Sequence, residues 1–128
     1  MVQGIEIRDA HFPGSAPIDA YGNGGFRFAD MSHKGSIICV PSGIYGIDLT
    51  QSTPTIFDVD RVLQEADAIE ILLIGTGVKL LRLPKEVRSA LQQRNISADT
   101  MSTGAAVRTY NVLLAENRAV AAILYAVE

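Results

Sequence analysis

The sequence predicts an α/β protein in which an antiparallel amino-terminal β portion is followed by a β-α-β-α-β unit. From Ile18 to Leu49, short apolar runs are separated by glycine-containing turns. After Thr50, apolar segments with a helical period alternate with apolar segments typical of strands. The length of 128 residues suits one core, so we expect a single domain over residues 1–128.

Residues 1–17 are expected to form an irregular arm. They contain several turn-forming residues and little periodicity: Gly4, Pro13, Gly14, Ser15 and Pro17. Between Ile18 and Leu49, the runs IDAY, GFRF, GSIICV and GIYGIDL are separated by NGG, SHKG and PSG, which are hairpin signals. Phe26 and Phe28 alternate with Arg27, which is the period of a strand with one solvated face. This region therefore predicts antiparallel strands.

The first helix after Thr50 is predicted to begin at Asp58 and to end near Asp67. Asp58 can cap this helix, and Asp60 is favourably placed in its first turn. The apolar positions follow the 3.6-residue period: Val59, Val62, Leu63 and Ala66. Residues 70–74 then predict a strand buried on both faces, because ILLI shows no polar alternation.

Two further helices are predicted, separated by a strand at residues 96–100. Pro84 suits the first turn of the earlier helix and Asn95 suits its end. Thr103 can cap the later helix, which Asn117 ends. The predicted inner stripe of that helix is Ala106, Tyr110, Leu113 and Leu114. Residues 119–127 close the chain as a long buried strand, and the helices between neighbouring parallel strands require right-handed crossovers.

Charge and hydropathy argue against several classes of protein. The net charge of −3 comes with no basic block, which argues against a nucleic-acid partner. The first residues, MVQGIEIRDAHFPG, lack the basic and apolar regions of a secretory signal. The longest apolar run has nine residues, at 119–127, whereas a spanning helix needs roughly 20. We therefore expect a cytoplasmic protein without direct membrane insertion.

The sequence offers no catalytic or metal-binding set. Cys39 is the only cysteine, so an internal disulfide and a thiolate cluster are excluded, and its apolar neighbours indicate a buried, inert thiol. His11 and His33 are far apart and have no metal-ligand companion at the right spacing. We expect no catalytic residues, no metal and no cofactor.

Gly75, Thr76 and Gly77 follow a predicted buried strand, as a phosphate-binding loop would. A dinucleotide fingerprint needs a third glycine, but Leu80 stands in that place. The next helix also begins only near Pro84, so its amides cannot face a pyrophosphate bound at the glycines. The sequence favours a turn that ends the strand, with phosphate binding as the alternative.

The second candidate site lies in MSTGAAVRTYN, residues 101–111. Ser102, Thr103 and the first amides of the helix could hold an anion, with Arg108 within two turns. Arg108 and Asn111 share a helix face, but they need not converge with the hydroxyls on one ligand. A purely structural role for these residues is the alternative.

The chain resembles a family of small domains of unknown biochemical function that includes mitochondrial respiratory complex I assembly factor 3. The stretches EILLIGTG, LP-x-EVR-x-x-L and AAVRTYNVLLAENRAVAAIL carry the resemblance, which extends upstream through FRFADMSHKGSIICVPSGIYGID. Its most specific part is RTYN at residues 108–111, followed by Glu116 and Arg118. The resemblance implies a three-layer α/β fold with a central mixed sheet, and it implies no enzyme activity.

Two functional hypotheses follow. The first is a non-enzymatic, assembly-factor-like domain that binds a protein partner, such as a membrane complex or its assembly machinery, and homo-oligomerisation stays open. The second is a small-ligand binder or enzyme for an anionic metabolite or nucleotide, with its site at the carboxyl edge of the parallel strands. The residues of that site would be Gly75, Thr76, Gly77, Ser102, Thr103, Arg108 and Asn111.

Overall fold

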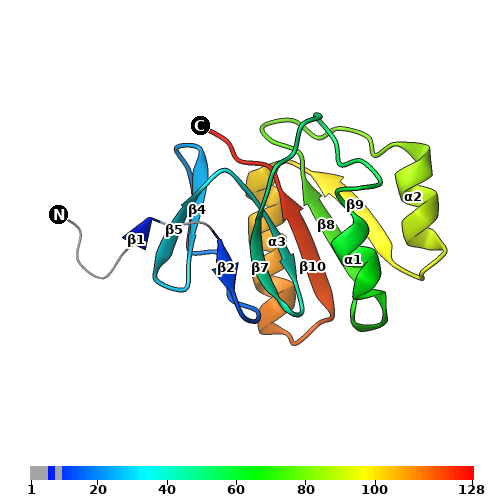
Figure 1. Ribbon diagram of the computed structural model, residues 1–128, viewed down its shortest axis with the longest axis horizontal. Helices are drawn as coiled ribbons and strands as arrows, with labels where there is room; N and C mark the ends of the chain where they lie inside the picture. The colour runs from blue at the N-terminus through cyan, green and yellow to red at the C-terminus, as the bar shows by residue number, and fades with distance from the viewer. Residues whose placement is uncertain (1–5, 8–9) are drawn as a thin grey trace.

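The computed structural model describes residues 6–7 and 10–128, which form two β-sheets and three α-helices (Figure 1). The larger sheet has six strands in the order β2-β7-β6-β10-β8-β9. These strands are β2 (His11–Phe12), β6 (Ser36–Val40), β7 (Gly43–Ile47), β8 (Ile71–Gly75), β9 (Ser97–Met101) and β10 (Val120–Leu124). The smaller sheet has the order β1-β5-β4-β3. Its strands are β1 (Glu6–Ile7), β3 (Ala20–Gly22), β4 (Gly25–Phe28) and β5 (Met31–Lys34).

The larger sheet is mixed, as the resemblance implied. β10 pairs with β8 and β8 pairs with β9 in parallel, whereas β2, β7, β6 and β10 pair antiparallel. The predicted β-α-β-α-β unit therefore supplies the parallel half, and the amino-terminal hairpin region supplies the antiparallel half. β10 is the seam between the halves, and all five of its residues are buried because both of its edges and both of its faces are covered.

The helices cover both faces of the larger sheet, which gives three layers (Figure 1). On one face, α1 (Asp60–Gln64), a short 3₁₀ helix (Ala66–Ala68) and α2 (Lys85–Gln92) lie over the parallel strands. On the other face, α3 (Thr103–Ala115) packs through Ala106, Val107 and Tyr110. Neighbouring strand residues alternate between the two cores, so Leu72 and Ile74 join α1 and α2, whereas Leu73 joins α3.

The smaller sheet packs on the α3 side of the molecule. Phe26 and Phe28 of β4 and Met31 of β5 are buried in the same core as α3, whereas Arg27 is exposed. The alternation predicted for GFRF is therefore confirmed. The sequence did not indicate that the antiparallel strands divide between two sheets, because each hairpin satisfies the same local pattern in either sheet.

The amino-terminal segment and the last strand differ from expectation. We predicted no element in residues 1–17, but β1 pairs with β5 and β2 pairs with β7; residues 1–5 and 8–9 lie outside the described residues. The predicted strand 119–127 is shorter, since β10 ends at Leu124. Beyond it, the amide of Tyr125 donates to the carbonyl of Gly75 at 2.9 Å and so ties the chain end to β8.

Two helix starts lie one residue away from the predicted caps. The residue before α1 is Val59, while a carboxylate oxygen of Asp58 accepts the amide of Thr55 at 2.8 Å in the preceding loop. Ser102 caps α3, because its hydroxyl accepts the amide of Ala105 at 3.3 Å. Thr103 is therefore the first helical residue, and its hydroxyl forms hydrogen bonds with the backbone of Gly77 and Tyr125. Shifts of this size are ordinary at helix ends.

The predicted ends of α2 and α3 are confirmed, whereas α1 ends at Gln64, before the predicted end near Asp67, and the 3₁₀ helix Ala66–Ala68 follows it. Asn95 follows α2 with φ of 62°, and Asn117 follows α3 with φ of 60°. Asparagine tolerates this left-handed conformation better than most residues do. The amide of Asn117 donates to the carbonyl of Leu114 at 3.0 Å, and the amide of Asn95 donates to the carbonyl of Gln92 at 3.0 Å.

None of the helices formed by residues 6–7 and 10–128 combines the length and the apolar character that crossing a bilayer requires.

Candidate functional site

The carboxyl ends of the parallel strands bring two of the predicted segments together. Gly77, just beyond β8, and Thr103, at the start of α3, exchange two hydrogen bonds. The Gly77 amide donates to Thr103 Oγ1 at 3.0 Å, and the Thr103 amide donates to the Gly77 carbonyl at 2.8 Å. Gly75, Thr76, Gly77, Ser102 and Thr103 therefore form one continuous group at this edge.

The hydroxyl groups in this cluster are bonded within the fold. Thr103 is fully buried, and besides accepting from Gly77 its hydroxyl donates to the Tyr125 carbonyl at 2.8 Å. The Thr76 hydroxyl lies 2.6 Å from the Lys79 carbonyl, to which it donates, and it accepts the Leu81 amide at 3.1 Å. The two threonines thus fasten the loop after β8 to α3 and to the end of β10.

Gly75 permits the close contact between β8 and α3. A Cβ at position 75 would lie 2.8 Å from Thr103 Cα, which is too close for any real contact, and 3.1 Å from Ala106 Cβ, which is tighter than most contacts. Gly77 has φ of 96°, a conformation that glycine adopts at little cost. The two glycines therefore serve close packing and a sharp turn, which is the role that the sequence favoured over phosphate binding.

Arg108 and Asn111 lie farther along α3, five and eight residues beyond Thr103. The Asn111 side chain bonds both backbone groups of Ile18: its amide nitrogen donates to the Ile18 carbonyl and its oxygen accepts the Ile18 amide, each at 2.9 Å. Arg108 is exposed beside Gly104. A Cβ at Gly104 would meet the hydroxyl oxygen of Tyr21, at the tip of that side chain on β3. Asn111 thus anchors the segment before β3 on α3.

Cys39 and Tyr110 form a buried pair between the larger sheet and α3. Burial raises the pKa of the Cys39 thiol to about 12, although its hydrogen bond with Tyr110 opposes the shift. Burial is also the main reason that the pKa of Tyr110 is raised, with the neighbouring Cys39 adding to the effect. The burial of Cys39 predicted from the sequence is confirmed, and a thiol with so high a pKa is protonated at neutral pH, as an inert cysteine would be. In the described part of the chain, no group of three His, Cys, Asp or Glu residues could hold a metal.

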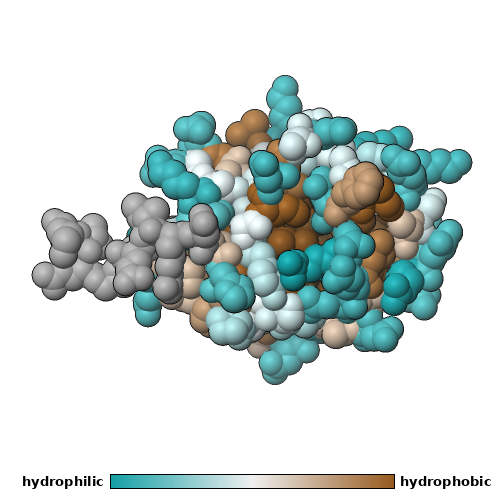
Figure 2. All heavy atoms as spheres, viewed as in Figure 1, coloured by the Kyte–Doolittle hydropathy of each residue, from teal (hydrophilic) through white to brown (hydrophobic). Residues whose placement is uncertain are grey.

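A hollow beside α1 was not indicated by the sequence analysis. It has a volume of about 340 Å³ and is lined by Ile38, Gly46, Ile47, Asp48, Phe57, Asp58, Asp60, Arg61 and Gln64. Phe57 is 87% exposed at its rim, and Ile56 next to it is 39% exposed. Figure 2 shows apolar surface gathered in the middle of this face, over β7 and β10 and beside α1. The only sign of this hollow in the sequence is the pair Ile56-Phe57 in a polar loop. Two adjacent apolar residues show no helical or strand period, so they do not predict a surface.

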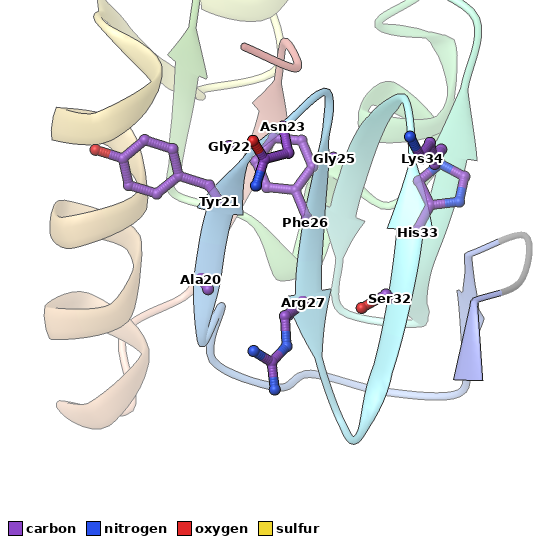
Figure 3. A pocket seen from close by; sticks show the side chains of 10 residues that line it. All are labelled: Ala20, Tyr21, Gly22, Asn23, Gly25, Phe26, Arg27, Ser32, His33 and Lys34. Atoms are coloured by element: carbon purple, nitrogen blue, oxygen red, sulfur yellow. The ribbon is translucent and has the colours of Figure 1, made fainter. Parts of the chain in front are cut away.

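A second cavity, of about 310 Å³, lies on the smaller sheet (Figure 3). In Figure 3, Tyr21 is directed from β3 toward α3, while Arg27 and Lys34 lie at opposite ends of the cavity. His33 forms part of its wall and accepts the Ala10 amide at Nδ1 at 2.9 Å. A third cavity, of about 430 Å³, lies near His33 and Asp48. None of the seven residues of the predicted ligand site lines these three cavities.

Comparison with known proteins places the fold in a family. A family described as "Protein of unknown function (DUF498/DUF598)" matches residues 18–125. The chain belongs to this family. The match covers both sheets apart from the short strands β1 and β2, and it confirms the family resemblance seen in the sequence.

Two known proteins are similar to this chain over most of its length. An uncharacterized protein of Rhodobacter capsulatus is 38% identical over 119 residues, which cover 91% of this chain and 90% of that protein. The mouse NADH dehydrogenase [ubiquinone] 1 alpha subcomplex assembly factor 3 is 30% identical over 94% of this chain. This chain spans only 65% of the mouse protein.

A solved structure agrees with the fold described above. The crystal structure of an outer membrane protein from Bartonella henselae is 75% identical, with a TM-score of 0.91 over 92% of this chain and 100% of that chain. This chain therefore shares its fold with that solved structure.

Proposed function

We propose that this chain is a non-enzymatic, assembly-factor-like protein that binds a protein partner during the assembly of a membrane-bound respiratory complex. The observation that carries the proposal is the 30% identity, over 94% of this chain, with the mouse assembly factor. The buried thiol of Cys39 and the internal bonding of Thr76 and Thr103 agree with a role in binding rather than in catalysis.

The partner surface that we favour is the hollow beside α1 with Phe57 at its rim. An aromatic side chain that is 87% exposed becomes a strong contact when a partner removes it from water, because fully burying phenylalanine contributes about 1.5–3 kcal/mol. Ile38 and Ile47 contribute apolar atoms to its lining, but most of the lining is polar: Asp48, Asp58, Asp60, Arg61 and Gln64. Such a surface suits a partner segment that places an apolar side chain against Phe57 and polar or basic groups against the three carboxylates.

Deletion of the gene in its source organism tests the proposal. We expect fully assembled complex I on native gels to fall and NADH–quinone oxidoreductase activity in membranes to fall with it, and a wild-type copy to restore both. A Phe57→Ser copy should accumulate to the wild-type level and restore neither. Unchanged assembly after deletion would remove the proposal, and full rescue by Phe57→Ser would remove the hollow as its surface.

We also propose a cytoplasmic location and leave open whether the partner is a second copy of the chain. Cell fractionation tests the first statement, and a strictly membrane-embedded protein that only detergent releases would refute it. Sedimentation over a range of protein concentrations tests the second. A dimer that Phe57→Ser converts to a monomer would show that a second copy covers the hollow.

The anionic-ligand site at the carboxyl edge is the second proposal. The support for it is the meeting of Gly77 and Thr103 at the ends of the parallel strands, where ligands bind in open α/β sheets. A thermal-shift screen with nucleotides, coenzyme A esters and phosphorylated metabolites is the test. A ligand at 100 times its dissociation constant adds about 2.7 kcal/mol to the free energy of unfolding, and Arg108→Ala should remove that gain. If no compound raises the midpoint, the proposal is abandoned.

A further inference from the structure

We propose that the segment from Thr76 to Arg88 docks the protein on an anionic lipid surface. This segment joins β8 to α2 and continues through the first turn of α2; it runs along the upper edge of the molecule in Figure 1. The inference goes beyond the proposed function, because lipid docking would use residues that do not line the hollow beside α1.

The segment concentrates positive charge in an acidic protein. The chain as a whole carries −3, yet these thirteen residues contain four basic side chains and one acidic one. All five are exposed: Lys79, Arg82, Lys85, Arg88 and Glu86. Lys85 and Arg88 are three residues apart on α2 and so lie on the same side of the helix. No ion pair among the described residues joins any of these four cations to a carboxylate within 4.0 Å.

The same segment exposes apolar side chains between its cations. Val78 is 82% exposed and Leu80 is 64% exposed, whereas Leu83 is buried in the core with Val87. In Figure 2, hydrophobic and hydrophilic groups are mixed along the upper edge, where Figure 1 draws this segment. Apolar side chains flanked by lysine and arginine are the composition that binds the interface of an anionic bilayer.

Hydrogen bonds hold the loop in a fixed shape, which lowers the entropy that docking would cost. The Thr76 hydroxyl bridges the Lys79 carbonyl and the Leu81 amide, so it closes the turn that carries Val78 and Leu80. The paired bonds between Gly77 and Thr103 fix the base of that turn to α3. The GTG sequence thus builds a braced, projecting loop, and a preformed binding surface loses less conformational freedom on binding.

The mode of binding is peripheral. The apolar side chains reach the boundary between headgroups and acyl chains, and the cations remain among the phosphates. Each basic residue near an anionic surface raises the partition coefficient roughly fivefold, the factor that corresponds to about 1 kcal/mol. In a bilayer, the phosphate groups of the lipids can bind the cations of the segment, and the acyl chains can contact its exposed apolar side chains. A soluble phosphate compound could bind only the cations.

Vesicle flotation with the full chain tests the inference. We expect the protein to float with vesicles of phosphatidylcholine mixed with phosphatidylglycerol, to stay at the bottom with phosphatidylcholine alone, and to lose binding as salt is raised. A Val78→Ser/Leu80→Ser double variant should lower the partition coefficient about tenfold or more. A Lys79→Gln/Arg82→Gln double variant should lower it roughly 25-fold, at about fivefold per charge.

Matched controls place the effect on this segment. Val112→Ser removes another exposed valine, which is 57% exposed on α3, and Arg118→Gln removes another exposed cation. Both should float like the wild type, and all variants should keep the wild-type thermal midpoint because they change exposed side chains. Equal flotation with both kinds of vesicle, no flotation at low salt, or equal losses in the loop and control variants would each overturn the inference.

Discussion

The side chain of Thr103 fastens the turn at Gly77: the Gly77 amide donates to Thr103 Oγ1 at 3.0 Å, while the same hydroxyl donates to the Tyr125 carbonyl at 2.8 Å. One buried hydroxyl therefore joins the end of β8, the start of α3 and the chain beyond β10. It accounts for a threonine at the first position of the helix, where the capping role belongs to Ser102.

Thr103→Val should destabilise the protein by about 2–4 kcal/mol. Valine keeps the volume but leaves the Gly77 amide and the Tyr125 carbonyl without their partner, and an unsatisfied buried group costs about 1–3 kcal/mol. Urea unfolding followed by circular dichroism measures the change. Thr109→Ala is the control, because that hydroxyl only back-bonds to Ala105 within α3 and its loss should cost under about 1 kcal/mol.

Gly75→Ala should destabilise the protein by about 1–3 kcal/mol or more. The added Cβ would lie 2.8 Å from Thr103 Cα, so the backbone of α3 must move away from β8. The midpoint of thermal unfolding measures the effect. Gly104→Ala is the control: the added methyl meets only the tip of the half-exposed Tyr21, which can rotate, and alanine favours the helix by up to about 1 kcal/mol. Equal losses at positions 75 and 104 would contradict this explanation.

Asn111→Ala should loosen the segment before β3 and cost about 1–3 kcal/mol. The change removes both bonds to the backbone of Ile18, whose side chain is 3% exposed. Hydrogen exchange at the Ile18 amide should become faster, whereas exchange in β8 should change little. Val112→Ala, on the exposed side of α3, should leave the exchange at Ile18 unaltered. Unchanged protection of Ile18 in Asn111→Ala would refute the anchoring role.

Stability should fall as pH rises from about 9 toward 12. The pKa of Cys39 is raised from 9.0 to about 12 in the folded protein, so the unfolded chain releases that proton first. The unfolded state then binds fewer protons than the folded state, which gives the free energy of unfolding a negative slope of up to about 1.4 kcal/mol per pH unit for this group. The contribution is complete below pH 9 and is lost as pH approaches 12.

The tyrosines act in the same direction. Burial raises the pKa of Tyr110, and burial with the Asp58 carboxylate raises that of Tyr125, so both add to the loss above about pH 10. Urea unfolding between pH 7 and 11 measures the slope. Cys39→Ala should reduce the slope between pH 9 and 10, where the thiol is the first of the three groups to ionise in the unfolded chain. A stability that does not change over this range would contradict the buried Cys39–Tyr110 pair.

Much of the secondary structure followed from local pattern. ILLI and AVAAIL lack polar alternation and form the buried central strands β8 and β10, and Phe26 and Phe28 alternate with Arg27 as β4 requires. Asn95 and Asn117 end their helices where expected, because few other residues accept a positive φ. These features depend on side-chain period and backbone preference, which adjacent residues express.

The tertiary structure alone decided how the segments meet. Asn111 bonds Ile18 across 93 positions of the chain, and Thr103 bonds Gly77 across 26, so no local pattern contains either pair. The division of the antiparallel strands between two sheets, the hollow at Phe57 and the braced loop at Val78 also depend on these distant contacts. Beyond residue 17, the sequence by itself determined which segments become strands and helices, because their periods select the face that each buries; β1 and β2 are too short to show a period. Only the tertiary structure decided which polar side chains form hydrogen bonds within the fold, because these bonds join residues that are close in space and far apart in the sequence.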